Sequence, residues 1–310
     1  MKIFKKFIAT TLAVLLIAPQ VAFAQERSAL DVLVSASELS YLPNDGDLMH
    51  SIMNGEISAL LNVNGELVAT LTANLHMAYE FNLEEDTFTM YIRLPIEIQG
   101  TDPLLGEELN ESLTVAMFSS QNAFAIYESG SGWLVEEIEE ATNIAMDMDV
   151  QSAISFGLQL NEYLFSAMQP TFSEEQVEGY YVIDIVMYNE DILTLVQSIF
   201  SYDFLSEILS LMGDTPELMD EDVVLLQQLL EDLIYAVEML LELAQVTISY
   251  TAFINQETGM FSSFRYEIDV VADIQAGMLL GDINIDALLI LDFEVDYETQ
   301  PTWPTIESLQ

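Results

Sequence analysis

The chain has 310 residues, of which 51% are apolar, and 52 acidic residues against six basic ones give it a formal net charge of −46. So acidic a protein is repelled by the phosphate groups of nucleic acid and by anionic lipid head groups. The charge therefore excludes nucleic acid as a partner and argues against direct docking on an anionic membrane. The high apolar content indicates a folded protein rather than a disordered acidic tail. Because the sequence has no cysteine, no disulfide can hold that fold together.

The N-terminus has the three regions of a secretory signal peptide. Lys2, Lys5 and Lys6 precede an apolar run over residues 7–18, and Ala-Phe-Ala at 22–24 supplies the small-x-small cleavage pattern. The run is shorter than the roughly 20 residues of a membrane-spanning helix. We therefore expect cleavage after Ala24 and a soluble product, secreted or periplasmic, in which residues 25–310 form one domain. That product has no lysine, and its three arginines leave a net charge of −49.

The first two thirds of the chain combine helical and strand patterns. A helix is predicted over 28–41. Alternation of apolar and polar residues with a period of two then predicts strands around 57–63, 67–81, 88–94, 113–117 and 124–126. Asn64-Gly65 is typical of a type I′ hairpin turn between the first two. Further helices are predicted over 152–168 and over 191–211, the latter broken near Tyr202, with a strand at 181–187 between them.

The last third begins with the longest predicted helix, 217–244, which follows Pro216 as helix starts often do. Its apolar residues occupy more than one stripe, as in a helix buried between layers. Three strands follow, over 246–254, 260–274 and 283–297, with a turn at 256–259. Antiparallel strands with one apolar face need a cover, and the helices supply it. We therefore predict an α+β fold: a strongly curved antiparallel sheet, or half-barrel, of about 8 to 11 strands, with helices over its concave apolar face.

A curved sheet closed by helices can enclose an apolar cavity, and such spaces bind hydrophobic ligands. The alternative is that the same side chains form a filled core, as close packing usually requires. The residues predicted to line the cavity are Leu71, Leu75, Met77, Met90, Ile92, Met117, Ile126, Ile183, Ile185, Ile248 and Tyr250.

The order of these elements resembles the LolA/LppX-like superfamily of lipoprotein and lipid carriers, in particular its uncharacterised Gram-positive secreted relatives. The segment 129–133, Ser-Gly-Ser-Gly-Trp, is similar to their hairpin ending in a tryptophan, and 246–259 is similar to their strand-turn-strand after the last helix. The resemblance implies a half-barrel with helices over an apolar cavity. The chain departs from many members in lacking both the lipid-anchoring cysteine and lysine.

Two classes of function are weighed. The first is an exported, non-enzymatic protein that binds a lipid or another hydrophobic small molecule. The second is an acidic cell-surface structural or interaction module, whose carboxylate clusters at 84–86, 136–140, 147–149 and 220–222 could bind divalent cations loosely. None of these clusters fits an EF-hand loop, so no defined metal site is predicted.

Catalysis has little support in the sequence. Of the two histidines, His76 falls on the polar side of its strand, and no motif for a nucleophile, a phosphate loop or a zinc site is present. A carboxylate hydrolase would need two acidic groups roughly 5–10 Å apart in a cleft, and no pair stands out. No catalytic residue and no cofactor is predicted. Trp303 is expected to pin the C-terminal segment to the fold.

Overall fold

The computed structural model describes residues 28–43, 47–85, 87–101, 108–120, 123–130, 132–137, 150–199, 220–275 and 282–304. The expected signal peptide, and the export that depends on it, lie outside these ranges, as does the helix break expected near Tyr202. None of the helices within them is long and apolar enough to cross a membrane.

One antiparallel sheet of eleven strands contains all the strands of the described residues. Its spatial order is β6-β5-β4-β3-β2-β1-β11-β10-β9-β8-β7, so the last strand of the chain pairs with the first at the centre. The strands are β1 (Leu48–Val63), β2 (Glu66–Asn82), β3 (Thr87–Thr101), β4 (Glu108–Ser119), β5 (Ala123–Glu128), β6 (Gly132–Glu137), β7 (Thr171–Phe172), β8 (Tyr180–Met187), β9 (Ala244–Asn255), β10 (Phe261–Gln275) and β11 (Asp282–Asp296).

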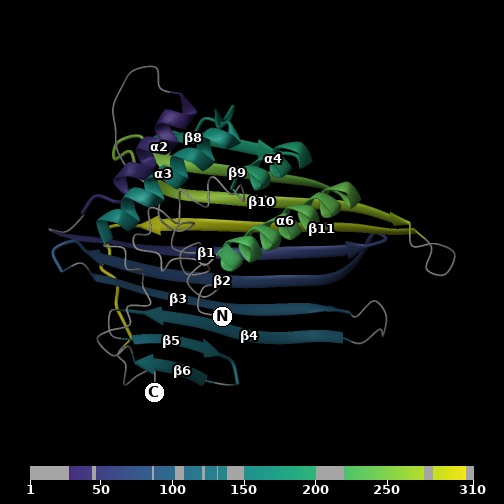
Figure 1. Ribbon diagram of the computed structural model, residues 1–310, viewed down its shortest axis with the longest axis horizontal. Coiled ribbons are helices and arrows are strands. Elements are labelled where there is room, and N and C mark those ends of the chain that lie inside the picture. Colours follow the sequence, from purple (N-terminus) through teal and green to yellow (C-terminus); the bar gives the residue numbers. More distant parts are fainter. Residues whose placement is uncertain are drawn as a thin grey trace.

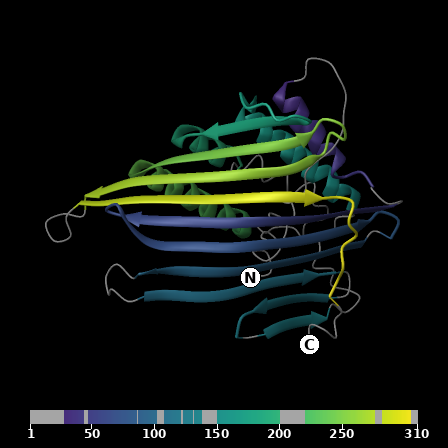
Figure 2. The same cartoon turned by 180° about the vertical axis from the view of Figure 1, so that it is seen from behind.

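Four helices of the described residues lie on one side of this sheet (Figure 1). They are α2 (Ala29–Leu39), α3 (Val150–Met168), α4 (Asn189–Ile199) and α6 (Asp220–Leu243). We call this side of the sheet the helical face and the opposite side the outer face, which is in front in Figure 2. The α+β class and the coverage of one sheet face by helices are confirmed.

The expected half-barrel is wrong, because the sheet is neither closed nor strongly curled (Figures 1 and 2). Its two edges are the short strands β6, with six residues, and β7, with two. Closing a sheet requires its edge strands to pair along their length. So little edge backbone cannot supply that pairing, and the sheet stays open and broad.

Local sequence signals set several of the boundaries. Asn64 and Gly65 have φ angles of 54° and 79°, the positive pair that a type I′ turn requires, so this hairpin prediction is confirmed. Ser28 caps α2: its Oγ accepts a hydrogen bond from the Asp31 amide at 3.1 Å, and the Asp31 carboxylate accepts one from the Ser28 amide at 2.9 Å. Asn189, which begins α4, donates from Nδ2 to the Leu241 and Ala244 carbonyls, both at 2.7 Å. It thereby ties α4 to the junction between α6 and β9.

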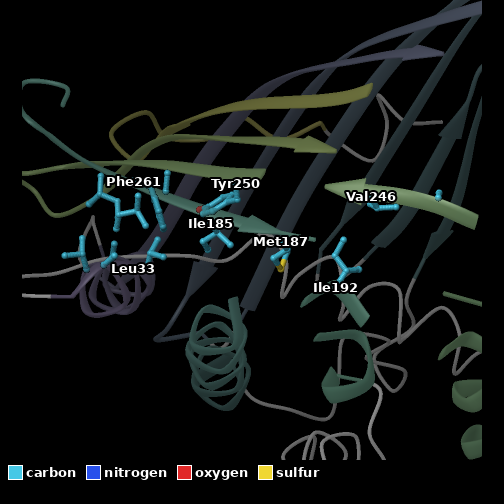
Figure 3. Packing of buried hydrophobic residues seen from close by; sticks show 14 of the residues in the cluster. Leu33, Ile185, Met187, Ile192, Val246, Tyr250 and Phe261 are labelled. Atoms are coloured by element: carbon cyan, nitrogen blue, oxygen red, sulfur yellow. The ribbon is translucent and has the colours of Figure 1, made fainter. Parts of the chain in front are cut away.

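The largest core lies between the helices and strands β8 to β10. Figure 3 shows Ile185, Met187 and Tyr250 directed from the sheet toward the helices that carry Leu33 and Ile192. Leu33 and Ile185 are almost completely buried. These side chains form a packed core beneath α2 and α4.

A smaller cluster lies on the outer face and anchors the C-terminal segment. Trp303 packs with Trp133 and Tyr91 against the buried pair Phe118 and Ala125. In Figure 2 the yellow segment after β11 runs across this face toward β5 and β6. The expectation that Trp303 pins the C-terminal segment is therefore confirmed.

Candidate functional site

The candidate site is a pocket of about 370 Å³ over the five central strands β3, β2, β1, β11 and β10. Cross-strand pairing places nine of its lining residues in two rows, one from Val270 through Leu61 to Ala69 and the other from Ile268 through Ala59 to Ile98. The other three, Leu60, Thr70 and Leu288, pair with one another at outward positions between these rows. Both rows belong to the helical face, because Ile268 and Val270 pack against the core under the helices. The pocket is lined by Ala59, Leu60, Leu61, Ala69, Thr70, Leu71, Ile98, Ile268, Val270, Ala287, Leu288 and Leu289.

Three alanines explain why this part of the face is hollow. Leu61 lies between Ala287 and Ala69 in one row, and in the other row Ala59 lies between Leu289 and Leu71. Small and large side chains therefore alternate in both directions across the centre of the sheet. A methyl group beside an isobutyl group leaves space above it, so the alternation produces a depression with apolar walls.

The pocket offers a ligand apolar contact and little else. Thr70 is its one polar lining residue, and its Oγ1 donates to the Gln99 carbonyl at 3.4 Å on the outer side of the strand. The backbone here is also occupied, because each of these strands has a paired neighbour on both sides. Such a site can bind by removing apolar surface from water. Its lining has no acidic side chain, no basic side chain and no histidine.

All eleven residues predicted to line a cavity occupy positions on the helical face. The register aligns Leu71 with Ala59, Met77 with Ile92, and Ile185 with Tyr250, and alternation along the strands carries the same orientation to the rest. The period-two pattern was therefore a reliable guide to which side of each strand faces the helices.

These residues do not gather at one place. Leu71 lines the pocket, whereas Ile183, Ile185, Ile248 and Tyr250 belong to or pack against the core under the helices. The remaining side chains pack in neighbouring clusters, except Ile126, which is 37% exposed near the β6 edge. The clustered residues are Leu75 and Met77 around Phe293, and Met90, Ile92 and Met117 around Tyr79.

The sequence reasoning missed most of the pocket. Ala59, Leu61, Ala69, Ala287 and Leu289 were recognised as the inward side of long strands but not as a site. The pattern that could have indicated the pocket is a small residue repeatedly placed among leucines. This pattern predicts a depression only once the register between β1 and β11 is known.

The outer face carries most of the charge of the sheet. Arg265 forms ion pairs there with Glu267 at 3.2 Å and with Asp292 at 3.7 Å. His76 also lies there, as expected, with its Nδ1 2.8 Å from Asn54 Oδ1. Desolvation, assisted by the nearby Arg93, lowers the pKa of His76, so the neutral ring is favoured.

Tyrosine hydroxyls form a buried polar group at the end of the sheet near α2. Burial raises the pKa of Tyr79 to about 12, with a hydrogen bond to Ser51 opposing the shift, and burial raises the pKa of Tyr266 to about 12 as well. The pKa values of Tyr41, Tyr250 and Tyr297 are also raised, mainly by burial. These hydroxyls stay neutral at ordinary pH and belong to the core rather than to the pocket.

Within the part of the chain that the structure describes, no three His, Asp or Glu side chains are grouped to hold a metal ion. The acidic clusters at 139–140 and 147–149 lie outside that part. Loosely bound divalent cations therefore stay a prediction.

Comparison with known proteins supplies no relative that could identify the site. No protein-family model and no curated protein matches the sequence. Among solved structures, OccK11 (OpdR) and the outer membrane protein OpdK, both from Pseudomonas aeruginosa, align at 7% and 8% identity with a TM-score of 0.14 each. They cover 82% and 78% of this chain, and the chain spans 68% and 58% of theirs. Scores this low establish no common fold.

Proposed function

We propose that the protein is an exported, non-enzymatic binding protein that holds an apolar ligand, such as a lipid or an acyl chain, on the helical face of its sheet. The observation that carries this proposal is the pocket of about 370 Å³ on the central strands. Its volume falls within the range of about 300–1,000 Å³ that is usual for small-molecule sites. Eleven of its twelve lining residues are apolar, so the ligand would be held by burial alone.

Exposed apolar surface on α6 gives the proposal further support. Leu230, Ile234 and Leu241 form the stripe of this helix that turns inward, and Leu230 is buried. Leu240 and Leu243 are 55% and 58% exposed on another stripe. Exposed apolar side chains grouped in this way are typical of binding surfaces. The pocket and α6 thus present apolar surface on the same side of the sheet.

The resemblance to the LolA/LppX-like superfamily is part of the same proposal. The order of the elements supports it: a leading helix, six strands, a helix, a strand pair, two helices and three closing strands. Export after Ala24 is likewise proposed on the sequence pattern alone. Because the sheet is open, the ligand would lie along a sheet face beside α6 rather than inside a closed barrel.

Titration with the neutral fluorescent dye Nile red tests the proposal. We expect saturable binding by the purified protein and loss of that binding in the double variant Ala59→Leu with Ala287→Leu, whose larger side chains fill the depression. Ser58→Leu is the control, since it adds one leucine side chain next to Ala59 but on the outer face. Mass spectrometry of organic extracts would identify a co-purified ligand. Equal dye binding by the filled variant and the control would overturn the proposal.

A further inference from the structure

The positions of the basic residues restrict the charge that a bound ligand can carry. Residues 28–310 contain two basic side chains other than histidine, Arg93 and Arg265. Arg93 follows Ile92, which packs toward α3, and Arg265 lies between Phe264 and Tyr266, which pack toward the core under the helices. Because side chains alternate along a strand, both arginines point to the outer face.

Among the described residues, the helical face therefore carries no guanidinium or ammonium group. The sequence has no further lysine or arginine after residue 27, and Arg27 lies outside the described residues. Both histidines, His50 and His76, occupy outward positions on β1 and β2 as well. The charged residues of α6, which lies on the helical side of the sheet, are all acidic, among them Glu231, Asp232 and Glu242.

Hydrogen-bond donors are equally scarce in the pocket. Its lining has one hydroxyl, that of Thr70, which is directed to the outer side. The amides of the central strands are paired within the sheet. An anionic head group brought here would lose hydration without gaining a cation or a donor, and it would also meet the negative field of the protein.

We infer that the pocket selects against anionic amphiphiles and accepts a single-chain amphiphile whose head group is uncharged or carries an amine. This inference rests on the proposed function, because it names the ligand class of the same pocket. An uncharged head group can remain in water at the rim at no electrostatic cost. An amine there is attracted by the carboxylates of α6.

Lauryl alcohol, laurylamine and laurate provide the test, because they share one alkyl chain and differ in charge. Each is used to displace Nile red from the purified protein at about pH 8, where laurate is ionised. We expect the alcohol and the amine to compete and laurate to be weaker by at least about tenfold. Equal competition by all three overturns the inference and leaves the proposed function standing. If none competes and Nile red itself does not bind, the proposed function fails.

A variant pair makes the test independent of head-group size. Ala69→Lys places an ammonium group in the pocket wall. Thr72→Lys is the control, because Thr72 pairs with Ser58 on the outer face of the same strand and does not line the pocket. We expect Ala69→Lys to raise laurate affinity by about tenfold and Thr72→Lys to leave it within about twofold of the parent protein. Equal effects of the two lysines would mean that net charge alone controls binding, which contradicts the inference. If Ala69→Lys does not fold, the three-ligand comparison on the unchanged protein decides the matter.

Discussion

Tyr79 offers the sharpest test of the buried tyrosine group. It is 4% exposed, and its pKa is raised to about 12 against an ordinary value near 10. A raised pKa of an acid means that the folded state favours the protonated form. The stability that the buried, protonated Tyr79 gives the folded state is therefore fully present below about pH 10, where the unfolded chain is also protonated. It is lost as the pH rises from about 10 to 12.

The size of the effect follows from the shift. One pKa unit corresponds to about 1.36 kcal/mol, so Tyr79 should cost the folded state about 2.7 kcal/mol between pH 10 and pH 12. Tyr79→Phe removes this cost together with the hydrogen bond to Ser51, which is worth about 1 kcal/mol. We expect the variant to be less stable than the parent by about 1 kcal/mol near pH 8. The two proteins should be equal near pH 11, and the variant should be more stable by about 1.5 kcal/mol near pH 12.

Urea unfolding followed by circular dichroism at several pH values measures this crossover, and near-ultraviolet phenolate absorbance shows when the tyrosines ionise. Phe81→Leu is the control, since Phe81 packs in the same cluster and has no titratable group, so its effect should not vary with pH. A constant stability difference between Tyr79→Phe and the parent from neutral to alkaline pH would refute the reasoning. So would ionisation near pH 10, with no loss of structure, of the one phenol that the parent has and Tyr79→Phe lacks.

Three further substitutions test the local structure, each by urea or thermal unfolding. Gly65→Ala should destabilise by about 1–2 kcal/mol, because a side chain is disfavoured at its φ of 79°; an unchanged midpoint would argue against the type I′ turn. Ser28→Ala should cost about 1 kcal/mol through loss of the α2 cap, and Ser28→Asp should restore it. Trp303→Ala should cost about 2 kcal/mol and increase proteolysis after β11, since the ring packs on Phe118 and Ala125. Unchanged protease sensitivity would show that the C-terminal segment needs no such anchor.

Most of the fold could be predicted because its signals are local. Period-two alternation identified the long strands and their inward sides, and Asn64-Gly65 identified a hairpin with its turn type. The helix ends were set by nearby side chains, as at Ser28. Curvature was not predictable in this way. It depends on how far the sheet edges can meet, and the shortness of β7 carries no clear mark in the sequence.

The pocket could not be predicted from the sequence, because it is formed by contacts between distant parts of the chain. Alternation showed that Leu71 and Ile185 face the same side, but it could not show which of them lies under a helix. The depression arises because Leu61 aligns with Ala287 on one side and with Ala69 on the other. The first of these pairs joins residues from opposite ends of the chain. No local pattern specifies that register, so the alanines could not be recognised as neighbours.

A single layer of backbone separates the two kinds of surface in this molecule, and this explains how strong acidity and apolar binding can coexist. In strands β8 to β11 every charged side chain occupies an outward position, including Asp184, Asp269 and Asp292. Repulsion among these carboxylates opposes folding and weakens as salt is added. The pocket uses no charge to hold an uncharged ligand, so its affinity for such a ligand does not depend on the same screening. The repulsion that opposes folding and the binding of an uncharged ligand therefore belong to opposite faces of the sheet, and a medium rich in cations would raise stability without weakening that binding.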